Sequence, residues 1–191
     1  MGYSKKQQIL DSALRLFVHQ GIQATSTASI AKEANVATGT LFHHFPSKQS
    51  LVLCLYSSIK SELGEAMQQC PHQQAPRQQV RHYWQQALQW AQANPEKLRF
   101  LLHIAHDPQF YTSQHQELMV ATMNFLVEQI KQAQHQQLLA PLPLDLVLNF
   151  CHNHYLACAN LFIEQPDLAH QRSYQDGAFQ ILWQGLSPVK S

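Results

Sequence analysis

The chain has 191 residues, of which 45% are hydrophobic and only 13% are charged, and its formal net charge is +1. This composition excludes a disordered chain, because there is enough apolar material for a core and too little charge to hold the chain open. No apolar run approaches the roughly 18–20 residues that a membrane span needs, and the first residues lack the apolar core of a signal peptide. We therefore expect a soluble cytoplasmic protein with no membrane partner.

The hydrophobic positions of the first 70 residues recur with helical spacing, and no stretch alternates with the period of a strand. The pattern predicts a helix over residues 4–20, a short helix that follows the capping residues 25–27, a second short helix over 38–44, and a long helix over 48–69. Gly21 is expected to end the first helix, and Asn35 lies where a left-handed turn residue is needed. Ser47 can cap the long helix.

The rest of the chain also has helical periodicity, and prolines separate its segments. It predicts helices over residues 77–93, from Pro95 to the Asp107-Pro108 break, and over 113–137, 144–165 and 170–186. The chain is therefore predicted to be all-α, with about nine helices in total.

The last two predicted helices have more apolar surface than one core contact would use. Two apolar stripes run along residues 144–165, and the final helix adds further apolar positions. This surplus favours a homodimer formed by a helix pair, although a thick monomeric core would explain it too. The residues that we expect at the dimer interface are Leu148, Tyr155, Phe162, Tyr174, Ala178 and Ile181.

Residues 27–45 have the pattern of a helix-turn-helix. Small residues are needed where the two helices cross, and Ala28, Ala31 and Ala34 supply them, with Asn35 in the turn. The second helix must offer short polar or planar side chains to DNA. The candidate DNA-facing residues on and after it are Thr38, Gly39, Thr40, Phe42, His43, His44 and Lys48. Residues 1–50 also hold five basic and two acidic side chains, which suits an anionic partner, but a charge difference this small is usually only a solvated surface.

Three segments carry a resemblance to a known family: ILDSALRLF at 9–17 with Gly21, SIAKEANV at 29–36, and TGTLFHHFPSK at 38–48. Together they resemble the DNA-binding domain of TetR-family transcriptional regulators. The resemblance implies that Thr27, Ser29 and Lys48 meet the DNA backbone, and that the helix over 38–44 enters the major groove. The chain departs from the family at Phe42, where tyrosine is common, and at Ala37, where serine or threonine is common, so that helix would need another cap, such as Thr38.

The same resemblance implies the organisation and function of the whole chain. Residues 1–47 would form the three-helix DNA-binding domain, and residues 48–191 a larger helical domain for effector binding and dimerisation. A homodimer would bind a palindromic DNA operator as a repressor, and a small molecule would release it through the long helix over 48–69, acting as a lever.

Candidate effector-binding residues are those where aromatic, methionine and polar side chains mix on inward helix faces. Their character favours an apolar or aromatic effector, although plain core packing would place the same residue types inside. The candidates are Trp84, Leu88, Phe100, His103, Ile104, Met119, Met123, His152 and Tyr155.

Other functions have weaker sequence support. His103 and His106 are spaced as a helical metal-ligand pair beside Asp107, but no zinc-type Cys/His quartet is present, so we expect neither a metal nor a cofactor. The alternatives are an enzyme that uses these histidines with Asp107, or a helical interaction module without DNA binding. No nucleophile or phosphate-loop motif supports an enzyme. The four dispersed cysteines fit small buried hydrophobes better than a redox sensor.

Overall fold

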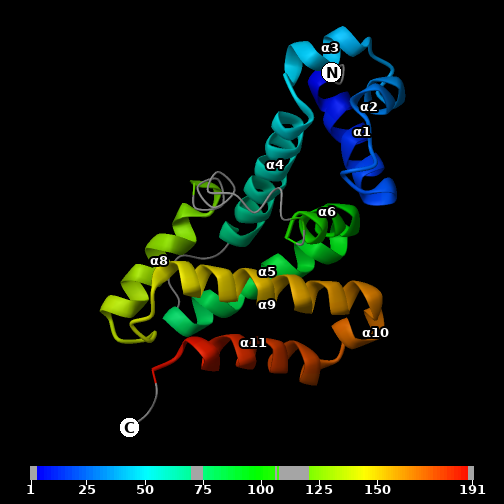
Figure 1. Cartoon of the computed structure of the whole chain (residues 1–191). Coiled ribbons are helices and arrows are strands. Elements are labelled where there is room, and N and C mark those ends of the chain that lie inside the picture. The colour runs from blue at the N-terminus through cyan, green and yellow to red at the C-terminus, as the bar shows by residue number, and fades with distance from the viewer. Residues whose placement is uncertain (1–3, 70–74, 106, 108–120, 189–191) are drawn as a thin grey trace. The chain divides into compact units, whose positions relative to one another are not determined.

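A computed structural model describes residues 4–69, 75–105, 107 and 121–188 (Figure 1). All regular structure in these ranges is helical, which confirms the all-α prediction. The helices are α1 Lys5–Gln20, α2 Thr27–Glu33, α3 Thr38–His44, α4 Lys48–Gln68, α5 Pro76–Ala93, α6 Pro95–Ala105, α8 Asn124–His135, α9 Leu144–Glu164, α10 Pro166–Ala169 and α11 Arg172–Leu186. None of these helices is long and apolar enough to cross a membrane.

Local sequence signals set most of the helix ends. The Ser4 hydroxyl accepts a hydrogen bond from the Gln7 amide at 3.2 Å, so α1 begins one residue later than predicted. Gly21 ends α1 with a φ of 83°, a conformation that glycine adopts without steric cost. Ser47 caps α4 as predicted, because its hydroxyl accepts from the Ser50 amide at 3.0 Å.

The turn between α2 and α3 also follows the sequence prediction. Ser26 caps α2, and Asn35 has a φ of 52°, as expected for the left-handed turn residue. Ala31 and Ala34 are buried, but Ala28 is exposed and does not take part in the helix crossing. The N-cap position of α3 is Ala37, and no side chain caps this helix, so Thr38 does not replace the missing hydroxyl.

Two features of the later helices were not predicted. Pro166 ends α9 as expected but also starts the one-turn helix α10, because proline suits the first position of a helix. The described part of the predicted helix over 113–137 is interrupted at Met123, which has a φ of −118° and a ψ of 28° and immediately precedes α8. Residues 113–120 lie outside the described part.

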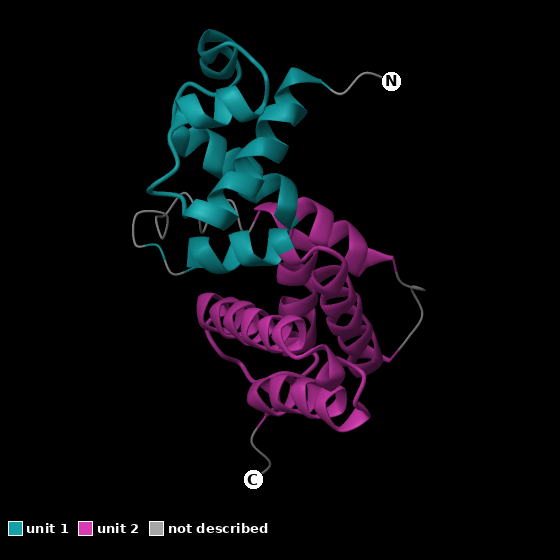
Figure 2. Cartoon of the chain, turned by 90° about the vertical axis from the view of Figure 1, so that its right-hand side faces the viewer, with its two compact units in different colours: residues 1–60, 96–118 teal, residues 61–95, 119–191 magenta. Residues whose placement is uncertain are grey.

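The chain divides into two compact units (Figure 2). Unit 1 comprises residues 1–60 and 96–118, and unit 2 comprises residues 61–95 and 119–191. Unit 1 therefore extends beyond the predicted DNA-binding domain of residues 1–47, because α6 packs on α1. The Phe17 and Phe100 rings are stacked with their centroids 6.1 Å apart, and the Gln23 side chain donates to the Asp107 carboxylate at 3.0 Å.

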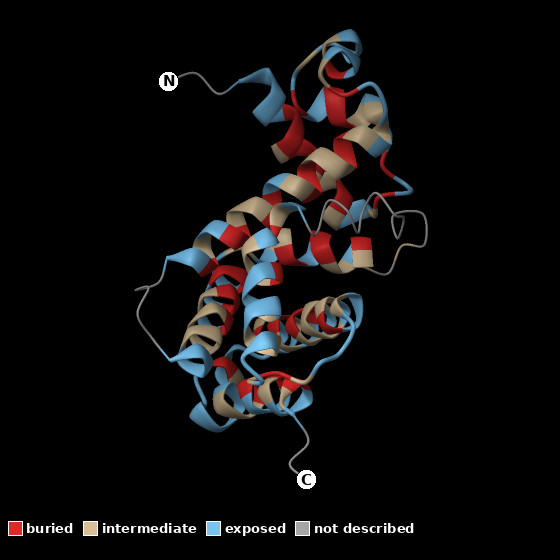
Figure 3. Cartoon of the chain, turned by 90° about the vertical axis from the view of Figure 1, so that its left-hand side faces the viewer, coloured by how far each residue is buried: buried red, intermediate tan, exposed pale blue. Residues whose placement is uncertain are grey.

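Unit 2 is organised around α9, which contacts α5, α8, α10 and α11. Within it, the Tyr155 hydroxyl donates to the Ala87 carbonyl at 3.2 Å and joins α9 to α5. The His154 ring is stacked on Trp84 and Phe150, with centroid distances of 5.2 and 5.8 Å. Buried residues lie on the faces where helices meet, and exposed residues form the opposite faces (Figure 3).

Candidate nucleic-acid interface

The helix α3 has one face buried in the core and an opposite face that is exposed. Leu41 is fully buried, and Phe45, the residue that follows the helix, is buried too. The exposed residues of α3 are Thr38, Gly39, Phe42 and His43, whose spacing places them along one helical face. Thr40 and His44 are half-buried beside this face. The arrangement leaves hydroxyl and imidazole groups, a bare backbone and one aromatic ring available to a partner.

Gly39 has no structural requirement within the chain. A Cβ atom added at this position would meet no heavy atom within 4 Å, and the residue does not have a positive φ. Glycine in a helix is less stable than alanine by about 1 kcal/mol. A glycine here is therefore costly to the free chain and suits a position that another molecule approaches closely.

Two of the three predicted backbone-contacting residues, Ser29 and Lys48, already have hydrogen-bond partners within the chain. The Ser29 hydroxyl donates to the Ser26 carbonyl at 2.7 Å within the α2 cap. The Lys48 ammonium donates to the carbonyl oxygens of Ile22, Gln23 and Thr25 at 2.8, 3.2 and 3.1 Å. Since an ammonium has three protons, a phosphate could bind Lys48 only by replacing or sharing one of these bonds.

Positive charge in this region comes from exposed side chains. Lys5, Lys6 and Lys32 are all exposed, whereas Arg15 forms an ion pair with Glu33 at 3.3 Å. Exposed lysines interact with polyanions through long-range attraction that salt weakens.

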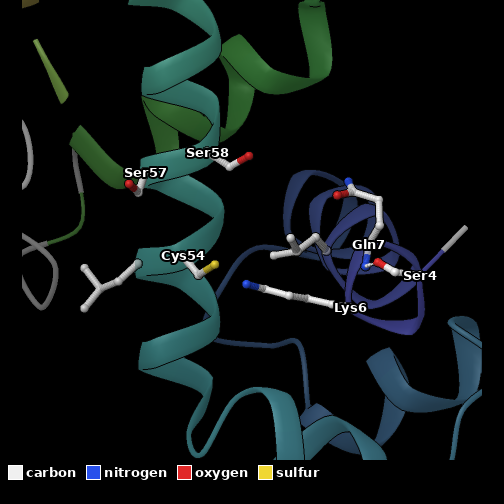
Figure 4. A pocket seen from close by; sticks show the side chains of 8 residues that line it. Ser4, Lys6, Gln7, Cys54, Ser57 and Ser58 are labelled. Carbon is white, nitrogen blue, oxygen red and sulfur yellow. Dashed lines mark hydrogen bonds between the residues drawn. The ribbon is translucent and has the colours of Figure 1, made fainter.

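A hollow between α1 and α4 lies within the same unit (Figure 4). It is lined by Ser4, Lys6, Gln7, Leu10, Leu53, Cys54, Ser57 and Ser58. The Lys6 side chain extends from α1 toward Cys54 on α4. None of the predicted effector-binding residues lines this hollow.

The predicted effector-binding residues are distributed over both units. Phe100 and Ile104 are buried in unit 1, and His103 is exposed there. Unit 2 contains Trp84, Leu88, Met123, His152 and Tyr155, all buried except the half-buried His152. Met119 lies outside the described residues. Phe100 packs against Phe17 of α1, so sequence periodicity identified a core residue but not what it contacts.

Trp84 is distinctive among these residues because its indole nitrogen is buried without a hydrogen-bond partner in the described structure. An unsatisfied buried donor costs about 1–3 kcal/mol. Such a cost is tolerated where a ligand or water supplies the acceptor. In the sequence Trp84 stands out only as an aromatic residue at an inward position, and no pattern of neighbouring residues signals its missing acceptor.

Lys60 of α4 is a second unusual group, and it is not among the residues predicted from the sequence. Its side chain is only 4% exposed, and burial lowers its pKa to about 8. It makes no hydrogen bond or ion pair with the described residues. The available signal was its position one turn after Tyr56, among apolar residues that face inward on a helix.

The cysteines and histidines do not form a reactive centre in the described residues. Burial raises the pKa of Cys151 to about 11 and also raises the pKa of Cys158, so both thiols stay protonated and weakly nucleophilic at neutral pH. No group of three histidine, cysteine or acidic residues in the described ranges could hold a metal ion. Asp107 accepts from Gln23 in unit 1, and His106 lies outside the described part.

The predicted dimer residues have two different environments. Tyr174 and Ile181 are exposed, and Leu148 is half-buried. In contrast, Tyr155, Phe162 and Ala178 are buried inside the protomer, which leaves little of these side chains for a second copy. The other large exposed apolar residues of α9 are Leu146 and Leu161, which the prediction did not include.

Comparisons with known proteins now identify the family of the first segment. A sequence model described as bacterial regulatory proteins, tetR family, matches residues 9–55. The HTH-type transcriptional regulator YvkB of Bacillus subtilis is 43% identical over 63 residues, which are 33% of each chain. AcrR of Shigella flexneri is 43% identical over 60 residues, which are 31% of this chain and 28% of AcrR. The matched region thus spans about a third of these curated relatives.

Solved structures extend the similarity to the whole chain. A crystal structure from Shewanella sp. PV-4, described as a tetR family transcription regulator, is 38% identical with a TM-score of 0.93. The match covers 97% of this chain and 100% of that one. A TetR family regulator from Marinobacter aquaeolei VT8 shares the fold at 20% identity, with a TM-score of 0.81 and 95% coverage of both chains. All of these descriptions name transcriptional regulators rather than enzymes.

Proposed function

Because the chain belongs to the TetR family of bacterial transcriptional regulators, which are not enzymes, we propose that it is a cytoplasmic homodimeric repressor that a small molecule releases from a palindromic operator. The observation that carries this proposal is the exposed face of α3, where Thr38, Gly39 and His43 lie together above a buried Leu41. A helix that is exposed on such a face can enter the major groove and reach base edges.

In this proposal the residues of α3 have distinct roles. Thr38 and His43 donate and accept hydrogen bonds at base edges, and Gly39 lets the backbone approach the DNA. Phe42, which is 43% exposed, makes an apolar contact in place of the hydroxyl contact that a tyrosine would offer. Thr40 and His44 flank this face, while Thr27, Ser29 and Lys48 face phosphates.

Dimerisation would use the exposed apolar side chains of α9 and α11. Leu146 and Leu161 on α9, with Tyr174 and Ile181 on α11, provide a surface that a second copy of the same chain can cover. Two copies would present two α3 helices to half-sites one or more DNA turns apart, roughly 34 Å per turn. The operator is therefore proposed to be palindromic.

Effector response would use the packing of α6 on α1. Three contacts join these segments within unit 1: the Phe17–Phe100 stack, the Gln23–Asp107 hydrogen bond and the His19–Glu96 pair at 4.0 Å. A ligand that displaces α6 would change the support of α1, on which α3 also packs. The unsatisfied indole nitrogen of Trp84 supports ligand binding in the helical body.

The test starts with selection of bound sequences from random duplex DNA at fixed salt concentration, because salt alters nonspecific binding strongly. We expect a palindrome to be enriched. The double variant Thr38→Ala/His43→Ala should then lose about tenfold or more in operator affinity, since each base contact contributes about 1–3 kcal/mol. Its melting temperature and dimeric state should stay unchanged because both residues are exposed.

The matched control is His135→Ala, which removes an exposed imidazole from the end of α8. It should bind the operator as the wild type does. Normal operator binding by the double variant would contradict the assignment of α3. Binding that remains weak and independent of sequence would contradict the operator proposal itself.

A further inference from the structure

Lys60 is a buried cation that the fold does not compensate. It lies on α4, and only 4% of the surface of this residue remains exposed. The long stem of a lysine usually lets its ammonium reach water even when the stem is buried. Here only 4% of the residue surface is accessible, and the ammonium forms no hydrogen bond or ion pair with the described residues.

The surroundings of Lys60 on α4 are apolar. Tyr56, Ile59 and Leu63 lie within one turn of it along the helix, and all three are buried. An ammonium in such a place loses most of its hydration, and protein charges buried in this way are normally paired. Burial correspondingly lowers the pKa of Lys60 to about 8, so the group is still mainly protonated at neutral pH.

We propose that Lys60 binds the charged group of the effector, and that this effector is a small carboxylic acid with an apolar body. This inference rests on the proposed effector response. A carboxylate carries one negative charge and so matches one ammonium, whereas a phosphate dianion would leave a charge unpaired. The apolar neighbours of Lys60 favour a hydrocarbon or aromatic body over a small inorganic anion. The expected class of effector thus changes from apolar to amphipathic and acidic.

Thermal-shift and calorimetric titrations of the full-length protein, without DNA, test this inference. The probes are octanoate and 3-phenylpropanoate, each compared with its uncharged primary amide at the same concentration. We expect at least one carboxylate to raise the melting temperature of the wild type, while its amide produces a smaller shift. This comparison does not depend on any variant folding correctly.

Two lysine variants identify the group responsible. Lys60→Met keeps the length of the stem and removes the charge, and it should weaken carboxylate binding by about tenfold or more, as expected for a charge-assisted hydrogen bond. Lys131→Met removes an exposed lysine of α8 that pairs with Glu128, and should leave binding unchanged. The preference for carboxylate over amide should disappear in Lys60→Met alone.

The inference would be overturned by equal shifts with acids and amides, or by an unchanged carboxylate affinity in Lys60→Met. Adding the same probes to the complex with operator DNA distinguishes carboxylate binding by Lys60 from release of the operator by the effector. Carboxylate binding that leaves the complex intact would refute release while supporting the role of Lys60. Release by an amide as effective as its acid would refute the role of Lys60 and support release.

Discussion

Residues 4–47 and the helical region that follows them differ in how they accommodate buried polar groups. In the first region the two buried polar residues are satisfied: Ser12 accepts from Arg15 at 3.2 Å, and Thr25 donates to the Gly21 carbonyl at 2.8 Å. In the described part of the second region, the indole nitrogen of Trp84 is buried without a hydrogen-bond partner, and Lys60 is a buried residue with no ion pair or hydrogen bond to the described residues. Among the described residues, the second region therefore keeps polar groups available in its interior for another molecule, whereas the first region does not.

The difference corresponds to where each region is proposed to meet its partner. DNA is read from outside, so the interior of residues 4–47 needs only to be stable and to hold α3 in place. A small effector is enclosed, so the helical region must keep polar atoms in its interior, at a cost to stability. DNA also has nearly constant geometry, which suits the local sequence match over residues 9–55, whereas effectors vary.

The largest expected effect concerns the outer surface of the helical region. Ile181 is 59% exposed, so Ile181→Asp should not disturb the fold of the protomer. If α11 forms the dimer interface, this variant should be monomeric and should lose about 10²–10⁴-fold in operator affinity, because avidity from two half-sites disappears. Light scattering and operator titration measure both quantities. Gln132→Asp, at an exposed position of α8, is the control, and a dimeric Ile181→Asp would exclude this face as the interface.

A smaller effect is expected when the unpaired charge of Lys60 is removed, and this change should stabilise the protein. Burial lowers the pKa of Lys60 from its usual 10.5 to about 8, so the unfolded chain binds more protons than the folded chain between these values. The free-energy cost of burying the charged Lys60 ammonium therefore opposes folding in full below pH 8. This cost decreases as the pH rises toward 10.5, because the folded chain then loses the proton. Lys60→Met should raise the free energy of unfolding at pH 7 by up to roughly 3 kcal/mol.

Urea denaturation at pH 7 and pH 10 measures this difference, which should narrow at the higher pH. Lys131→Met should change stability little at either pH, because Lys131 is exposed. A Lys60→Met protein that is less stable than the wild type at pH 7 would mean that the ammonium has a favourable partner after all.

The smallest effect concerns the two helices of the DNA-binding motif. Ser26 caps α2, whereas Ala37 leaves α3 without a side-chain cap. Ala37→Ser should raise the free energy of unfolding by about 1 kcal/mol, and Ser26→Ala should lower it by a similar amount. Thermal denaturation of both variants tests the pair. A destabilising Ala37→Ser would indicate that the start of α3 cannot accept a serine cap.

Local chemistry explains which features could be predicted from the sequence. Residues such as Ser47, Asn35 and Gly21 act on their own backbone or on amides three residues away, so their roles follow from neighbouring positions alone. The same locality made the helix-turn-helix predictable together with the exposed residues of α3. The left-handed Gln137, with a φ of 58°, was missed because glutamine has no local preference for that conformation.

What covers each apolar or charged side chain follows from the folded arrangement of distant segments. Periodicity shows that one face of a helix is buried, but core packing, an effector and a second copy all select similar residues. The sequence therefore could not reveal that Phe100 stacks on Phe17, or that Tyr155 and Phe162 are buried within one protomer. It also could not show that the Lys48 ammonium donates hydrogen bonds to three carbonyl oxygens. Nor could it show that Lys60 is buried without an ion pair to the described residues, because burial and pairing depend on residues far away along the chain.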